Sequence, residues 1–360
     1  MAKTNKPNLP YRFYVLLAGT LATIKKNRTT RMKKLILLTI LTAFGLQSCN
    51  VGTTGTWKDE NIEQSLKNEI ETLDKKVLEA ITSNNTDLLK SIMSDKLLEK
   101  DGNNIGQLIE QASSVITTTD YEVLNQFQAK NSTTGIGNTI VSGISGLNNY
   151  VIHYQALNEE MFISLLIPKS GLDEFIVTNI YGKYPDGWKL NILQFGQYKV
   201  NGQTAPELYS ESKTEYEKGY LMDAANNMFL SSRVANPANN FWQYQKEDEM
   251  KEFYEKVMTE INSEFKFPMT LETIDSKPQI LSIYPQGTAD GYFPMIEYLT
   301  NLDLKDTIQT KAEYEKMHSE IVKAFSGIDK DKDYIFYKAF SEMPNGKTPV
   351  PTYGFVKELK

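Results

Sequence analysis

The 360-residue chain contains one cysteine and two histidines, and this scarcity excludes several classes of protein. A single cysteine cannot form an internal disulfide, so the chain is not a disulfide-stabilised scaffold. Two histidines far apart in the sequence, together with one cysteine, cannot supply a zinc site of the usual tetrahedral kind. We therefore predict no metal and no cofactor.

Acidic side chains are absent from residues 1–48, which carry nine Lys and Arg. Residues 49–360 contain the other 30 of the 39 basic residues and all 45 Asp and Glu. The formal net charge is −6 for the whole chain and −15 for this part. An acidic body lacks the clustered Lys and Arg that neutralise phosphates, which excludes nucleic acid as a partner. A content of 40% hydrophobic and 23% charged residues is that of a globular chain. It excludes a polytopic membrane protein and a chain disordered throughout.

The apolar run before the single cysteine is too short to span a bilayer. Met32-Lys33-Lys34 precedes Leu35–Leu46, a 12-residue apolar run of the length found in the h-region of a signal peptide. The run ends in Leu46-Gln47-Ser48-Cys49, which resembles the bacterial lipobox, Leu-x-small-Cys. The resemblance implies cleavage before Cys49, a diacylglycerol group on its sulfur and acylation of the new N-terminus. Two or more acyl chains make a stable membrane anchor.

The segments around this motif complete the predicted leader. We predict that residues 32–48 are the signal peptide and that residues 1–31 are a non-native upstream extension; a long n-region or an extra membrane segment are the alternatives. Residues 49–59 are predicted to be a flexible tether, because 50–56 are small and polar. The chain resembles Bacteroidota lipoproteins in its Lys/Asn/Tyr-rich character. No acidic surface-export signal follows Cys49, which favours the periplasmic face of the outer membrane.

Residues 60–203 are predicted to form the first domain of the body. Apolar residues at helical spacing predict helices over 66–81, 88–97 and 105–115. Five strands follow, joined by short turns that favour an antiparallel meander: 121–129, 150–156, 160–168, 174–183 and 188–199. Helices followed by such a sheet make an α+β fold. The pattern resembles the NTF2-like cone, which implies a pocket between the sheet and a helix.

The remainder is predicted to contain a helical pair over 204–265 and a small α+β unit over 266–360. Thr204 and Glu207 have capping-box spacing at the start of the pair, and Asn236-Pro237 separates its helices. In the last unit Thr310 and Glu313 have the same spacing, within a helix over 308–325. The strands of that unit are predicted at 267–274, 280–284, 292–299, 334–340 and 353–356.

His153 is the candidate catalytic residue, since histidine titrates near neutral pH. The NTF2-like resemblance implies a general base in the cone pocket; the alternative is a half-exposed strand histidine. His318 is predicted to lie on a solvated helix face. The glycine-rich segment 135–146 lacks the ending of a phosphate loop and favours a glycine-bent strand or a loop. Asp329–Asp333 resembles the start of a calcium loop, but Tyr334 and Phe340 stand where that loop needs Gly and Glu.

Three aromatic residues close together, Phe241, Trp242 and Tyr244, form the predicted binding surface. Packing against a neighbouring domain is the alternative. Because no catalytic set is assembled, the leading hypothesis is a membrane-anchored periplasmic lipoprotein that is not an enzyme and binds a small ligand or a protein partner. The alternatives are an NTF2-like enzyme with His153 as base, or a structural component of envelope assembly.

Overall fold

The computed structural model describes residues 53–169 and 171–359. The predicted extension (1–31), the predicted signal peptide (32–48) and Cys49 lie outside these residues. The described chain contains eight α-helices and thirteen strands in three sheets, which confirms the predicted α+β class. Within the same part of the chain, no helix is both long and apolar enough to cross a membrane.

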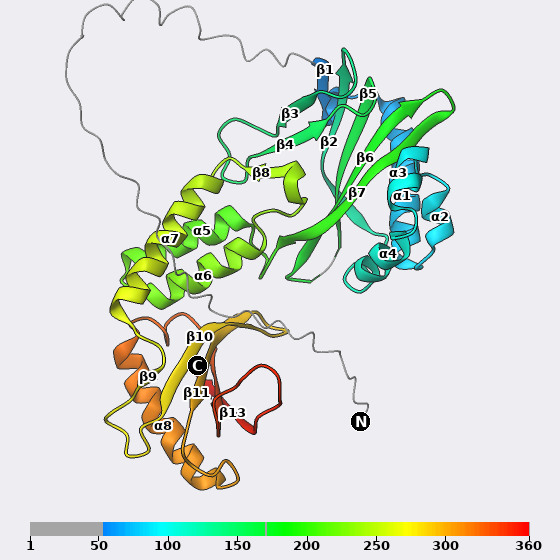
Figure 1. Ribbon diagram of the computed structural model, residues 1–360. Helices are drawn as coiled ribbons and strands as arrows, with labels where there is room; N and C mark the ends of the chain where they lie inside the picture. The colour runs from blue at the N-terminus through cyan, green and yellow to red at the C-terminus, as the bar shows by residue number, and fades with distance from the viewer. Residues whose placement is uncertain (1–52, 170, 360) are drawn as a thin grey trace, which may run out of the picture. The chain divides into compact units, whose positions relative to one another are not determined.

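The first sheet has five strands, each antiparallel to its neighbours, in the order β1-β2-β5-β6-β7 (Figure 1). Its central strand β5 is buried on both faces, since Phe162 joins the core on one side and Ile163 the core on the other. This double burial explains the nearly continuous apolar sequence of the strand. The strands are β1 (Thr53–Lys58), β2 (Tyr121–Asn131), β5 (Glu160–Pro168), β6 (Glu174–Tyr184) and β7 (Gly187–Lys199).

The prediction of a flexible tether through residue 59 is wrong from Thr53 onward. β1 pairs with β2 from Thr53, opposite Asn131, to Lys58, opposite Phe127. Asp59 then fixes the chain, because its carboxylate accepts hydrogen bonds from the Gln126 amide at 2.7 Å and from the side chain of Asn125 at 2.8 Å. The chain is therefore held in the fold from Thr53, the first described residue, which is four residues after Cys49.

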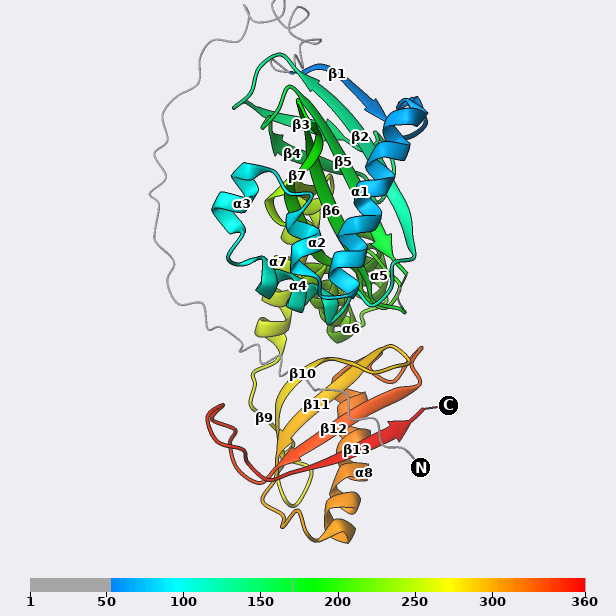
Figure 2. The ribbon, with the colours of Figure 1, turned by 90° about the vertical axis from the view of Figure 1, so that its right-hand side faces the viewer.

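Four helices pack on one face of this sheet (Figure 2). They are α1 (Gln64–Thr82), α2 (Thr86–Lys90), α3 (Asp95–Asp101) and α4 (Ile105–Ser113). The single helix predicted over 88–97 is in fact α2 and α3. Between them, the amide of Leu190 on β7 donates a hydrogen bond to the Ile92 carbonyl at 2.8 Å. The Ser94 amide donates one to the Leu190 carbonyl at 2.9 Å. This segment covers the edge of β7, which would otherwise be open, and so it leaves the helical conformation.

A small second sheet, in the order β3-β4-β8, and helices α5 and α6 share the core on the other face of the first sheet. Its strands are β3 (Gly137–Val141), β4 (Tyr150–Gln155) and β8 (Trp242–Tyr244). β4 was predicted inside the meander, but it pairs with β8, ninety residues later, because Tyr150, Ile152 and Tyr154 are buried on this side. A contact of such long sequence separation has no local signature.

The predicted helical pair is a set of three helices: α5 (Ala205–Glu217), α6 (Leu221–Arg233) and α7 (Glu247–Glu264). The capping box of Thr204 and Glu207 is confirmed. Gly219 has a φ of +79°, a left-handed conformation that ends α5 and that glycine adopts most readily. Both α6 and α7 contribute to two cores: Met228 and Met250 join the core shared with the first sheet, and Ala224 and Val257 join the core of the third.

The third sheet has the order β13-β12-β11-β10-β9, and α8 packs on one of its faces (Figure 2). Its elements are β9 (Met269–Thr270), β10 (Gln279–Gly287), β11 (Tyr292–Leu299), α8 (Thr307–Ala324), β12 (Tyr334–Phe340) and β13 (Thr352–Glu358). β11 and β12 are parallel, as a connection through a helix requires. Asp306, not Thr310, caps α8; Thr310 and Glu313 are buried inside the helix.

Candidate functional site

His153 lies on the outer face of the small sheet, not in an enclosed pocket. Its neighbours along β4, Ile152 and Tyr154, are buried, and alternation along a strand places His153 on the opposite side. Its Nε2 is 2.9 Å from Oε1 of Gln243 on β8. The prediction that His153 faces a cone interior is therefore wrong, and the alternative of a half-exposed strand histidine is confirmed.

Replacing His153 with glutamine is expected to change the free energy of unfolding by about 1 kcal/mol or less, because one partly exposed hydrogen bond is at stake. Urea denaturation followed by circular dichroism measures this. Ile152→Ala is the matched control, since that neighbour is fully buried and its loss should cost about 2–5 kcal/mol. Equal losses for the two variants would contradict the outer position of His153.

Trp242 and Tyr244 are core residues, so the predicted exposed binding surface is wrong for both. Their exposed fractions are 2% and 1%, and Phe241 is half-buried. The Trp242 ring stacks on Tyr150 with centroids 3.7 Å apart and meets Tyr198 edge-on at 6.0 Å. A run of aromatic residues suggested exposure, but alternation in β8 directs both rings into the core and leaves Gln243 between them on the outer face.

The least exposed carboxylate among the described residues is Asp74 on α1, at 1%. Its Oδ1 accepts hydrogen bonds from Nδ2 of Asn179 at 2.8 Å and from the Tyr181 hydroxyl at 2.7 Å. Its Oδ2 accepts one from the Ser164 hydroxyl at 2.7 Å. Ser164 comes from β5 and the other two from β6, so the carboxylate joins α1 to the centre of the first sheet.

Burial raises the pKa of Asp74 to about 6, against the lowering effect of its three hydrogen-bond donors. Burial, and then the charge of Asp74, raises the pKa of nearby Tyr121 to about 12. A carboxylate that titrates near neutrality is suited to proton transfer. Enclosure between a helix and a sheet, however, leaves it no contact with solvent, and its partners hold it in place.

Sequence reasoning missed Asp74, although a signal was present. The buried face of α1 carries Ile70, Asp74, Val77 and Ile81, at steps of four, three and four residues. An acidic residue on an apolar helical face must have partners in the core, because an unpaired buried charge is strongly destabilising. The partners come from strands 90 to 107 residues later, which the spacing could not reveal.

The other candidate motifs have structural roles. A Cβ on Gly143 or Gly146 would come within 2.8 Å of Oδ1 of Asn149, so these glycines make room for that side chain inside a loop. In the acidic segment, Lys332 forms an ion pair with Asp223 of α6 at 2.9 Å. The described residues contain no group of three or more His, Cys, Asp or Glu placed to hold a metal ion. His318 is half-buried rather than solvated, and its Nδ1 lies 2.7 Å from the Tyr337 hydroxyl.

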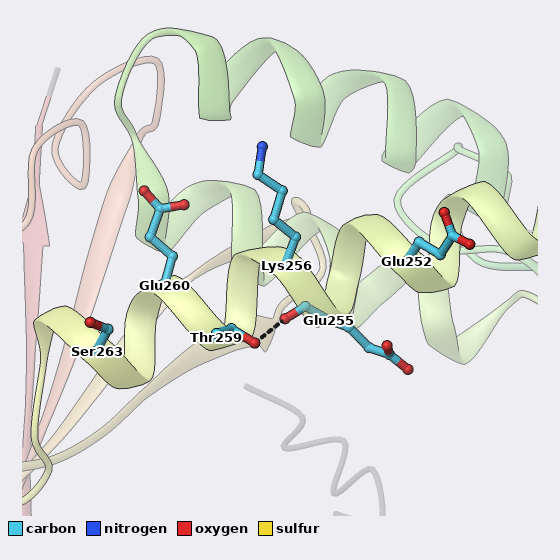
Figure 3. Close-up of a pocket in the computed structure, with 6 residues that line it drawn as sticks. All are labelled: Glu252, Glu255, Lys256, Thr259, Glu260 and Ser263. Atoms are coloured by element: carbon cyan, nitrogen blue, oxygen red, sulfur yellow. Dashed lines mark hydrogen bonds between the residues drawn. The ribbon is translucent and has the colours of Figure 1, made fainter. Parts of the chain in front are cut away.

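An open depression runs along the surface of α7 (Figure 3). Tyr216 of α5 contacts two of the lining residues. Its hydroxyl donates a hydrogen bond to Oε2 of Glu260 at 2.6 Å, and the centre of its ring lies 4.3 Å from the ammonium of Lys256. All of the lining side chains project from one helix and are exposed, so they do not enclose a ligand. They are Glu252, Glu255, Lys256, Thr259, Glu260 and Ser263.

The face of the third sheet opposite α8 is a partly exposed apolar surface. Register places Tyr284, Met295, Phe336 and Val356 in one row across four strands. In the next row the Glu297 carboxylate forms an ion pair with Lys338 at 3.3 Å and accepts a hydrogen bond from Tyr284 at 3.2 Å. Val356 is 53% exposed. Exposed apolar surface of this kind marks sites of protein contact.

No family model, curated protein or solved structure matches this chain.

Proposed function

We propose that the chain is an exported lipoprotein, held at a membrane by acyl groups on Cys49, whose body binds a protein partner or a small ligand. The observation that carries this proposal is Leu46-Gln47-Ser48-Cys49 at the end of a 12-residue apolar run headed by two lysines. The cysteine is the only one in the chain, and every acidic residue lies after it. A leader of this charge and length directs export, and acyl chains on the cysteine anchor the mature protein.

The proposed location is the periplasmic face of the outer membrane. The absence of acidic residues directly after Cys49 favours this side. The fold adds a physical constraint: four residues span about 13–14 Å at most, so the body would lie close to the bilayer.

A binding role rather than catalysis is supported by where the titratable groups lie. His153, the candidate base, is on an outer sheet face with a glutamine as its partner. Asp74, whose pKa is suited to proton transfer, is enclosed and held by three donors. The apolar row on the third sheet offers a surface for a protein partner. A structural role in envelope assembly remains the alternative proposal.

Within this proposal, residues 60–203 are an NTF2-like unit in which the pocket is filled. Helices that precede and cover one face of an antiparallel sheet support the likeness. Asp74, Tyr181 and Asn179 occupy the space between α1 and the sheet, where an open cone would hold a ligand. Binding would then use the outside of the unit.

The anchor is tested by replacing Cys49 with serine in the full chain. The variant is expected to accumulate as an uncleaved precursor without acyl groups, because the sulfur is the acceptor of the diacylglycerol. Mass spectrometry of the wild-type N-terminal peptide should show an acylated Cys49 as the first residue. Globomycin, which blocks the lipoprotein signal peptidase, should reproduce the precursor.

Ser48→Ala is the matched control for this experiment. It keeps a small residue before the cysteine and should be processed like the wild type. A wild-type protein whose mature N-terminus lies elsewhere, or whose Cys49 carries no acyl mass, would contradict the proposal.

A further inference from the structure

The β3–β4 hairpin and its flanks differ in composition from the rest of the molecule. Residues 131–158 contain no Lys, Arg, Asp or Glu, although these make up 23% of the chain. Charged side chains are costly to move out of water, so a surface that contacts lipid avoids them.

The loop between β3 and β4, together with the end of β3, presents apolar side chains to solvent. Ile144 is 96% exposed, Val141 51% and Leu147 41%. Of nine large hydrophobic residues that are exposed in the described chain, three therefore fall within seven residues. The loop projects from the end of the small sheet (Figure 1). Such a concentration of exposed apolar side chains marks an interaction site.

The backbone of this loop is firmly held, so the exposure is part of the folded structure. Ser142 donates its amide to the Tyr150 carbonyl at 2.9 Å, and its hydroxyl accepts from the Tyr150 amide at 2.8 Å. The side chain of Gln245 donates to the Gly143 carbonyl at 2.9 Å. Lys58, the last residue of β1, donates to the Ser142 carbonyl at 2.7 Å.

The contact with Lys58 connects the loop to the proposed anchor. β1 spans six residues, about 3.3 Å each, and its first residue is four residues after Cys49. The acyl chains and the loop tip are therefore separated by one strand and one short segment. When β1 lies along the membrane, both reach the bilayer.

We propose that Val141, Ile144 and Leu147 insert into the interfacial layer of the phospholipid bilayer that holds the Cys49 lipid. This inference rests on the proposed anchor and adds a second contact that sets the orientation of the body. Three apolar side chains bind weakly by themselves, but the lipid anchor keeps them at the surface. The ammonium of Lys58, at the base of the loop, is placed near lipid phosphates.

The test uses the acylated full-length protein in phosphatidylethanolamine–phosphatidylglycerol vesicles. Acylated Cys49 has no free thiol, so Ile144→Cys can be labelled alone with a bimane fluorophore. Lipids that carry a nitroxide near the top of the acyl chain are then added. We expect several-fold stronger quenching, and a bluer emission, at position 144 than at Ile308→Cys. Ile308 is the matched control, since it is 83% exposed at the start of α8.

The outcomes separate this inference from the anchor itself. Acyl mass on Cys49 with equal quenching at 144 and 308 would overturn the insertion and leave the anchor intact. A blue shift at 144 without quenching would mean that protein covers the loop, which also overturns it. Absence of acyl mass would overturn both proposals. Val141→Ser with Leu147→Ser should reduce quenching at 144, because two of the three inserted side chains are lost.

Discussion

Replacing Asp74 with alanine is expected to destabilise the body by about 3–5 kcal/mol at neutral pH. The substitution leaves Nδ2 of Asn179 and the hydroxyls of Tyr181 and Ser164 without their acceptor in a core that water does not reach. Each buried donor left unpaired costs about 1–3 kcal/mol. Urea denaturation followed by circular dichroism measures the loss.

Asp74→Asn is the companion variant, and the sign of its pH effect follows from the raised pKa. The pKa of Asp74 is about 6 in the folded protein, against an ordinary value of 3.8, so the folded state holds this proton more tightly. The resulting stabilisation is fully present below about pH 4 and is lost as the pH rises through 6. A difference of about two pKa units corresponds to about 3 kcal/mol.

Unfolding of both proteins at pH 4, 5, 6 and 7 therefore isolates this carboxyl. The stability of the wild type relative to Asp74→Asn should fall by up to about 3 kcal/mol across the range. Asp223, whose pKa burial also raises to about 6, is present in both proteins and cancels in the comparison. Parallel pH profiles would contradict the raised pKa of Asp74. An alanine variant as stable as the wild type would show that the hydrogen bonds to Asp74 do not stabilise the fold.

Trp242→Ala is expected to cost about 3–5 kcal/mol, the range for loss of a large buried aromatic side chain. The ring is 2% exposed and is surrounded by Tyr150, Tyr198 and Tyr244. Phe241→Ala is the matched control: this neighbouring aromatic residue is half-buried, and its loss should cost clearly less. Thermal unfolding and urea denaturation of both variants make the comparison. A Trp242→Ala variant that folds with unchanged stability would contradict the core position of Trp242 and would favour the predicted binding surface.

Elements with a strong local pattern could be predicted well from the sequence. β5 was predicted at 160–168, β11 at 292–299 and β12 at 334–340, and each has those bounds in the structure. Their length and their β-branched or aromatic content are typical of strands, so the local pattern indicates the conformation. Breaks within helices were harder to predict. Gly219 divides one predicted helix into α5 and α6, and hydrogen bonds to the edge of β7 divide the helix predicted over 88–97 into α2 and α3.

The candidate site was less predictable, because it depends on which side of an element faces the core. The sequence predicts His153 in a strand but Trp242 in a loop between two helices. The pairing of β4 with β8 makes a strand of Trp242–Tyr244, and it directs His153 outward and Trp242 inward. Asp74 is visible as an acid on an apolar helical face, but its three partners arrive from β5 and β6.

The sequence by itself determined the shortage of cysteine and histidine, the separation of charge at Cys49 and the α+β class. These follow from composition and local periodicity, which every stretch of the chain carries within itself. Tertiary structure alone decided that Thr53–Lys58 pair with β2, that Asp74 is held inside the core and that the apolar β3–β4 loop remains outside it. Each of these depends on contacts between segments that are distant in the chain, and burial rather than local propensity sets their outcome.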